Sequence, residues 1–256
     1  KVDLFILVSI LLSFALLPIL LSSTEQPNTE SPKFFSLREF YTVSPLGFVG
    51  ALATGLSHSA VFGYGAIYAS SINLSLFEIS LYMMIITSAG ALSQWPIGYL
   101  SDRIDRRVIL IGVSFMASGL SLFFVFASFM PLTLFLIFTG LFSIACLPMY
   151  SLTVAHTNDF LQPNEIVSAS ATFGILIGIG SILGPLFVSG FMEILGAVGF
   201  YIYLFLIHGL LGLFGLYRMT QRTKPRDLES QYNPLPQNIS PAGMEMNPVT
   251  EPTEDE

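Results

Sequence analysis

Long apolar runs separated by short polar stretches make up most of the chain. A helix that crosses a bilayer needs about 20 consecutive, mostly apolar residues, and seven runs approach or exceed this length. The pattern therefore predicts an all-α membrane protein with spanning helices over residues 4–21, 46–71, 79–100, 108–127, 132–154, 167–191 and 197–217. The first run has a second interpretation, a secretory signal peptide, which its length and Pro18 disfavour.

The basic residues are confined to alternate connecting segments. Segments 22–45, 101–107 and 155–166 and everything after residue 217 are long or charged, whereas 72–78, 128–131 and 192–196 are short and lack Lys and Arg. Positive charge accumulates on the cytoplasmic side of membrane proteins. The first set, including the C-terminus, is therefore expected in the cytoplasm. Lys1 is the one exception.

Two polar segments flank the main group of apolar runs. Residues 23–45 contain Pro27, Pro32 and Pro45 and are predicted to be a connector, with a short surface helix over 37–41 whose aromatic residues lie at the lipid interface. Residues 219–256 carry seven acidic and three basic residues and six prolines. We interpret them as a disordered acidic tail; a docking tail is the alternative.

Composition narrows the function. Apolar residues make up 53% of the chain and charged residues 11%, and the mean hydropathy is +0.71, which excludes a soluble globular enzyme and a disordered scaffold. A net charge of −7 argues against a nucleic-acid partner. The single cysteine, Cys146, forms no internal disulfide. The sequence has no phosphate-binding loop, and therefore ATP-driven pumping is not expected; no cofactor is expected either.

Segment 98–107 carries the clearest motif. Gly98 allows a neighbouring helix to approach closely, and Asp102 stands where its carboxylate can hold the N-terminus of an adjacent helix. Arg103, Arg106 and Arg107 anchor the turn at the cytoplasmic face. A basic loop that only sets topology is the alternative, but it does not account for the order of Gly, Asp and Arg.

This segment resembles the loop signature of the major facilitator superfamily, G-x-L-x-D-R/K-x-G-R/K-R/K, except that Asp105 replaces the second glycine. Segments 44–47, 94–98 and 155–159 resemble the YcaD-like branch of bacterial permeases. The chain begins at Lys1, close to an apolar run, and we interpret it as a fragment. The resemblance implies the end of transmembrane helix 6 at 1–22, the central cytoplasmic linker at 23–45, the C-terminal six-helix bundle (helices 7–12) at 46–218 and the acidic cytoplasmic tail at 219–256.

Polar residues inside the apolar runs are costly and are therefore candidates for function. They recur at helical spacing in two runs, which the resemblance places beside the central cavity; the candidate cavity-lining residues are Thr54, His58, Tyr64, Tyr68, Ser143 and Tyr150. His58 can titrate near neutral pH and take part in proton coupling. A neutral histidine bonded to a carbonyl or serine is the alternative. His208 is expected to be structural, and Tyr201 and Tyr203 to lie in an outer aromatic belt.

Two further groups have expected roles. Gly180 and Gly184 form a face of small residues for helix packing, and Pro185 is a bending point. His156, Asn158 and Asp159 lie at the cytoplasmic mouth, where we expect a salt link or hydrogen bond with the 103–107 loop rather than a metal site.

These features predict a permease of the bacterial inner membrane rather than an enzyme. The resemblance implies that it moves a small solute by alternating access, with the lipid bilayer, the solute and a missing N-terminal six-helix half as its partners. The alternative is a half-transporter that acts as a membrane interaction or regulatory module.

Overall fold

The computed structural model describes residues 2–21, 35–126, 130–162 and 165–221, and these residues are helical, with short connections and no strand among them. The chain divides into two units, residues 1–32 and 33–256. The first holds α1 (Val2–Leu21), an apolar helix that contains Pro18. Most of the predicted acidic tail and residues 22–34 of the predicted connector lie outside the described residues.

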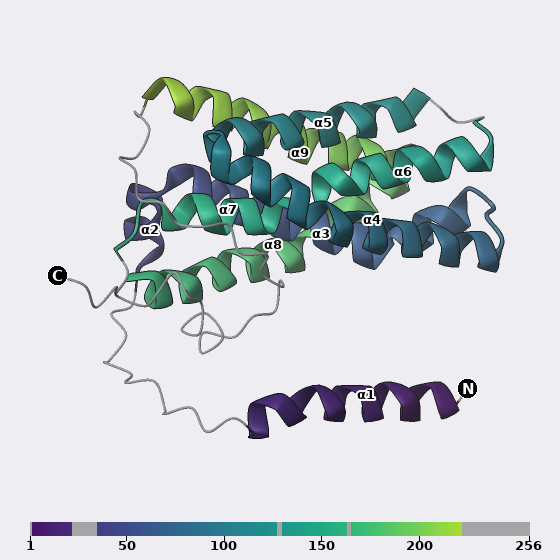
Figure 1. Cartoon of the computed structure of the whole chain (residues 1–256). Coiled ribbons are helices and arrows are strands. Elements are labelled where there is room, and N and C mark those ends of the chain that lie inside the picture. The colour runs from purple at the N-terminus through teal and green to yellow at the C-terminus, as the bar shows by residue number, and fades with distance from the viewer. Residues whose placement is uncertain (1, 22–34, 127–129, 163–164, 222–256) are drawn as a thin grey trace. The chain divides into compact units, whose positions relative to one another are not determined.

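The second unit is a bundle of helices that run side by side (Figure 1). Among the described residues, six spans are long and apolar enough to cross a membrane, which confirms the six full runs predicted after the connector. The elements are α2 (Leu37–Val43), α3 (Pro45–Ser71), α4 (Leu76–Arg103), α5 (Arg106–Phe126), α6 (Leu132–Cys146), α7 (Met149–Asn158), α8 (Ile166–Leu195) and α9 (Val198–Gln221).

The fourth full span is interrupted, which differs from the single helix predicted over 132–154. α6 ends at Cys146 and α7 begins at Met149. Pro148 has no N–H, and so the carbonyl of Ile144 cannot form its regular helical hydrogen bond. Leu147 packs tightly against α4, because a Cβ placed at Gly90 would lie 2.1 Å from Leu147 Cδ1. The break between α6 and α7 therefore packs against Gly90 of α4, where a larger residue would collide with Leu147.

The short helix predicted in the connector is present as α2. It begins with a capping box in which Ser36 Oγ accepts the N–H of Glu39, while the Glu39 carboxylate accepts the N–H of Ser36. Its expected lipid-facing position is wrong for Phe40, which is only 1% exposed. The Phe40 ring packs edge-on against Phe173 of α8, and α2 is therefore tied to the bundle.

Glycines bring α3 and α8 into close contact. A Cβ at Gly180 would lie 2.5 Å from the Leu52 carbonyl oxygen, and one at Gly184 would lie 2.6 Å from the Leu56 carbonyl oxygen. Side chains at these positions would collide with backbone, and therefore only glycine permits this separation. Pro185 lies inside α8, which continues through it.

Tyr201 and Tyr203, predicted to lie in an outer aromatic belt, lie near the start of α9 but are not exposed on the surface of the bundle. Both side chains are buried, and Tyr201 stacks on Phe124 with ring centroids 4.2 Å apart. The Tyr203 hydroxyl donates to the Leu56 carbonyl at 3.1 Å. These contacts join α9 to α3 and α5 inside the bundle. Burial of the two tyrosines is tolerated because their hydroxyl groups have hydrogen-bond partners there.

Candidate functional site

One end of the bundle carries Arg103, Arg106, Arg107 and Arg218, and we call it the basic end. Arg106 is the centre of an ion-pair network there. Its Nη2 lies 2.9 Å from Asp102 Oδ1 at the end of α4. Its Nη1 donates to the Asp159 carboxylate and, at 3.2 Å, to the Ala155 carbonyl. The Arg106 side chain is only 8% exposed. One buried guanidinium thus joins the turn between α4 and α5 to the end of α7, and the expected salt link to Asp159 is present.

Asp105, which stands where the loop signature has glycine, binds Arg107. Its Oδ2 lies 2.6 Å from Arg107 Nη2, and its Oδ1 accepts the backbone N–H of Arg107 at 3.0 Å. Asp105 therefore caps the start of α5 through the backbone N–H of Arg107. The Arg103 guanidinium lies 4.0 Å from the centre of the Tyr99 ring. Gly98 is buried, and its carbonyl accepts the Ser101 hydroxyl.

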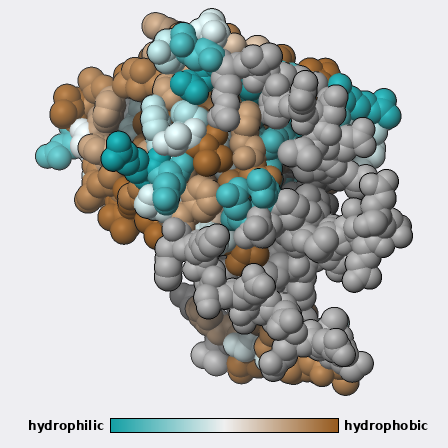
Figure 2. Space-filling model, turned by 90° about the vertical axis from the view of Figure 1, so that its left-hand side faces the viewer, coloured by the Kyte–Doolittle hydropathy of each residue, from teal (hydrophilic) through white to brown (hydrophobic). Residues whose placement is uncertain are grey.

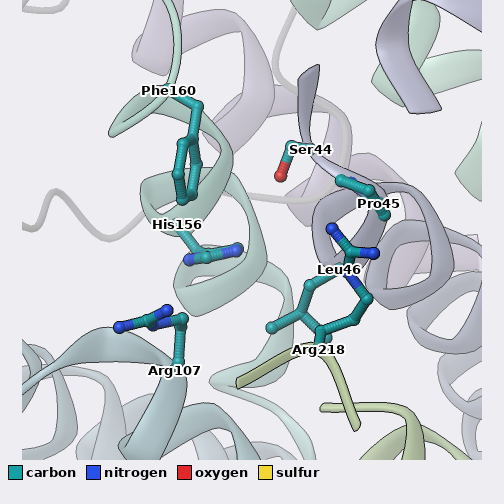
Figure 3. Close-up of a pocket in the computed structure, with 7 residues that line it drawn as sticks. All are labelled: Ser44, Pro45, Leu46, Arg107, His156, Phe160 and Arg218. Carbon is teal, nitrogen blue, oxygen red and sulfur yellow. The ribbon is translucent and has the colours of Figure 1, made fainter. Parts of the chain in front are cut away.

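His156 and Asn158 lie close to this network. His156 is buried in α7 with its ring edge-on to Phe160, and it lines a small pocket with Arg107 and Arg218 (Figure 3). Asn158 ends α7, and its carbonyl accepts the N–H of Leu161. Within the described part of the chain, no group of three or more His, Cys, Asp or Glu residues is arranged to hold a metal ion.

A second polar cluster lies deep inside the bundle. Ser57 Oγ lies 2.9 Å from His208 Nε2 and 3.3 Å from Cys146 Sγ. His58 Nε2 lies 3.1 Å from the Cys146 carbonyl oxygen, and because a carbonyl only accepts, this nitrogen is the donor. The four residues connect α3, α6 and α9.

His208, for which the sequence pattern predicts a structural role, belongs to this cluster, and that role stays a prediction. It is fully buried, and its Nδ1 has no hydrogen-bond partner among the described residues; the same holds for Thr54 Oγ1. Buried polar atoms without partners are rare and call for an explanation. Ser57 and His208 are 151 positions apart in the sequence. The sequence feature that marks each of them as a candidate is a polar side chain within an apolar run.

The other candidate cavity-lining residues lie in or near the packed interior. Thr54, Tyr68, Ser143 and Tyr150 are buried, and Tyr64 is partly buried. The Ser143 hydroxyl donates to the Thr139 carbonyl within its own helix. Tyr68 stacks on Phe200, and Tyr150 packs edge-on against Phe173. That these residues border a transport pathway stays a prediction.

Comparison with known proteins gives the family. Residues 47–244 match the model of the Major Facilitator Superfamily. The chain is similar to the uncharacterized MFS-type transporter YcaD of Escherichia fergusonii, with 26% identity over 73% of this chain and 48% of the relative. Its similarity to YcaD of Escherichia coli O6:K15:H31 is 24% identity over 70% and 46%. The chain thus spans about half the length of these relatives. It belongs to the Major Facilitator Superfamily, a family of membrane transporters that are not enzymes.

Proposed function

We propose that this chain supplies half of a secondary transporter that moves a small solute by alternating access. In this proposal residues 46–218 are helices 7–12, residues 1–22 end helix 6, residues 23–45 form the central linker and residues 219–256 form an acidic tail. A second six-helix bundle is the partner, and rocking of the two bundles opens the solute site to each side in turn. The chain alone is expected not to transport.

The Arg106 network is the observation that carries this proposal. It joins α4, α5 and α7 at one end of the bundle through contacts to Asp102 and Asp159. Charge-assisted contacts of this kind are strong when made but can be exchanged for water or other partners without repacking apolar side chains. The network is therefore suited to stabilise one of two states of a rocking transporter.

Proton coupling through His58 is part of the proposal. The ring of His58 donates to the Cys146 carbonyl beside the interruption between α6 and α7. A histidine that gains a proton gains a second N–H donor and a positive charge, and inside a membrane both need partners. Protonation at this position would thus favour a different arrangement of the interrupted span, which is how a proton can drive a conformational change.

We also propose that the basic end faces the cytoplasm and that the membrane is the bacterial inner membrane. Arg103, Arg106, Arg107 and Arg218 all lie in or beside the turns and helix ends at this end of the bundle. Figure 2 looks onto this end and shows hydrophilic side chains gathered there, with hydrophobic side chains beside them. This distribution is the one that positive-inside topology produces.

The test is uptake by the full-length protein in proteoliposomes that contain a trapped pH-sensitive dye. A panel of labelled sugars, amino acids and organic acids identifies a solute, and Asp102→Asn is expected to lower its uptake with insertion unchanged. His58→Ala is expected to abolish solute-dependent proton movement. Gly178→Ala is the control, because a Cβ there meets no atom within 4 Å from another part of the chain that the structure describes. Normal uptake by Asp102→Asn would refute the proposal that the loop stabilises one transport state. Normal proton movement by His58→Ala would show that His58 has a structural role and does not couple proton movement to transport.

A further inference from the structure

We propose that the small pocket at the basic end of the bundle binds the phosphate group of an anionic phospholipid. Four helix ends meet there: the starts of α3 and α5 and the ends of α7 and α9. The lining residues are Ser44, Pro45, Leu46, Arg107, His156, Phe160 and Arg218 (Figure 3). None of the four residues of the interior histidine cluster lines this pocket.

The charged side chains that line the pocket are those of two arginines, Arg107 and Arg218. Arg107, His156 and Arg218 line it, and no Asp or Glu does so among the residues that the structure describes. Arg107 is paired with Asp105. Arg218 lies in the last turn of α9, is partly buried, and has no ion pair with any carboxylate of the described ranges. A partly buried guanidinium at a membrane surface is a strong site for phosphate, because its planar donors match the phosphate oxygens.

The opposite wall supplies a neutral donor. Ser44 caps α3, and its Oγ accepts the N–H of Gly47 at 3.2 Å. A hydroxyl group that accepts one hydrogen bond still has its own hydrogen to donate. Figure 3 shows the Ser44 hydroxyl, the His156 ring and the Arg218 guanidinium on different sides of one space. A phosphate oxygen placed there would meet the Ser44 hydroxyl at the start of α3 and the Arg218 guanidinium at the end of α9.

The size and surroundings of the pocket favour a lipid over a soluble phosphate. Its cavity volume of about 20 Å³ accommodates little more than one oxygen atom, and the rest of a headgroup must remain at the mouth. Val108, next to Arg107 in the sequence, and Leu216 and Tyr217, just before Arg218, have exposed apolar side chains on α5 and α9. Acyl chains can cover this surface while one phosphate oxygen enters the pocket and the rest of the headgroup stays at its mouth, where basic pockets between membrane helices bind anionic headgroups.

The experiment measures binding of phosphatidylglycerol to the full-length protein purified in a neutral detergent. Native mass spectrometry counts retained lipids, and thermal unfolding at increasing lipid concentration gives an apparent Kd. Phosphatidylcholine and inorganic phosphate are tested in parallel. Arg218→Gln is expected to weaken phosphatidylglycerol binding roughly tenfold, and Arg218→Lys by less, since Lys keeps the charge without the planar fork.

Arg103→Gln is the matched control. It removes the same charge from the same end of the bundle, but Arg103 lies over the Tyr99 ring and does not line the pocket. Binding that falls for Arg218→Gln and not for Arg103→Gln supports the site. Equal losses in both variants would show general charge attraction and overturn it. Competition by inorganic phosphate at the same affinity, or equal binding of phosphatidylcholine, would overturn the assignment to an anionic lipid.

Discussion

The ion pair between Arg106 and Asp159 should contribute more to folding stability than any other charged contact at the basic end. Asp159→Asn removes one partner while keeping the size of the side chain. Arg106 would retain Asp102 and the Ala155 carbonyl but would lose its carboxylate partner at the end of α7. We therefore expect a clear loss of stability without a change in the apolar packing of the bundle.

The magnitude follows from burial. The side chains of Arg106 and Asp159 are 8% and 14% exposed, and removing one partner of a buried pair costs about 3–5 kcal/mol. The contacts that Arg106 keeps reduce this to about 2 kcal/mol, which is a factor of roughly 30 in the folded-to-unfolded ratio. Asp102 is 33% exposed, and so Asp102→Asn should cost only about 0.5 kcal/mol.

The assay is unfolding of the full-length protein in mixed detergent micelles, with the free energy of unfolding measured for both variants. A double-mutant cycle that adds Arg106→Gln isolates the coupling between the two side chains. We expect a coupling energy above about 1 kcal/mol for Arg106 with Asp159. A coupling energy near zero, or an equal cost for Asp102→Asn and Asp159→Asn, would refute the reasoning from burial.

Three further predictions concern packing, the interior cluster and pH. Gly184→Ala should destabilise the protein by about 1–3 kcal/mol through overpacking against α3, whereas Gly178→Ala should be neutral or slightly stabilising in the same unfolding assay. Ser57→Ala should cost about 1–3 kcal/mol, because it leaves Nε2 of His208 without its hydroxyl partner. The capping hydrogen bonds hold the pKa of Glu39 below its usual value. Its contribution to stability is therefore present above pH 4.5 and lost as the pH falls through the lower folded-state pKa; Glu39→Gln should remove this pH dependence in unfolding measured between pH 3 and 6.

The sequence was sufficient to locate the spans, because a bilayer requires long apolar helices whose backbone groups are satisfied internally. The ends of these helices were less accurate. The run predicted over 79–100 is the central part of α4, which extends from Leu76 to Arg103. Ser75 and Glu78 form a capping box at its start, a polar signal that a search for apolar residues alone passes over.

The interior of the bundle could not be predicted in the same way. In a soluble helix the apolar face marks the core, but in a membrane span the lipid-facing side is also apolar. Hydropathy therefore gave no means of distinguishing the buried Tyr201 from an exposed aromatic residue at the bilayer surface. The contact of Ser57 with His208 joins two spans far apart in the sequence, and nothing local to either residue indicates the other.

The departure at Asp105 shows why a family signature needs a structure for its interpretation. Glycine at a tight turn usually signals a positive φ, and its replacement by Asp would then strain the turn. Among the described residues, however, only Asn73 and Gly196 have positive φ values, and so position 105 does not need the conformational freedom of glycine. The carboxylate instead binds both the side chain and the backbone N–H of Arg107. An aspartate in place of the family's glycine thus holds the Arg107 side chain in a fixed position at the start of α5, where Arg107 also lines the pocket.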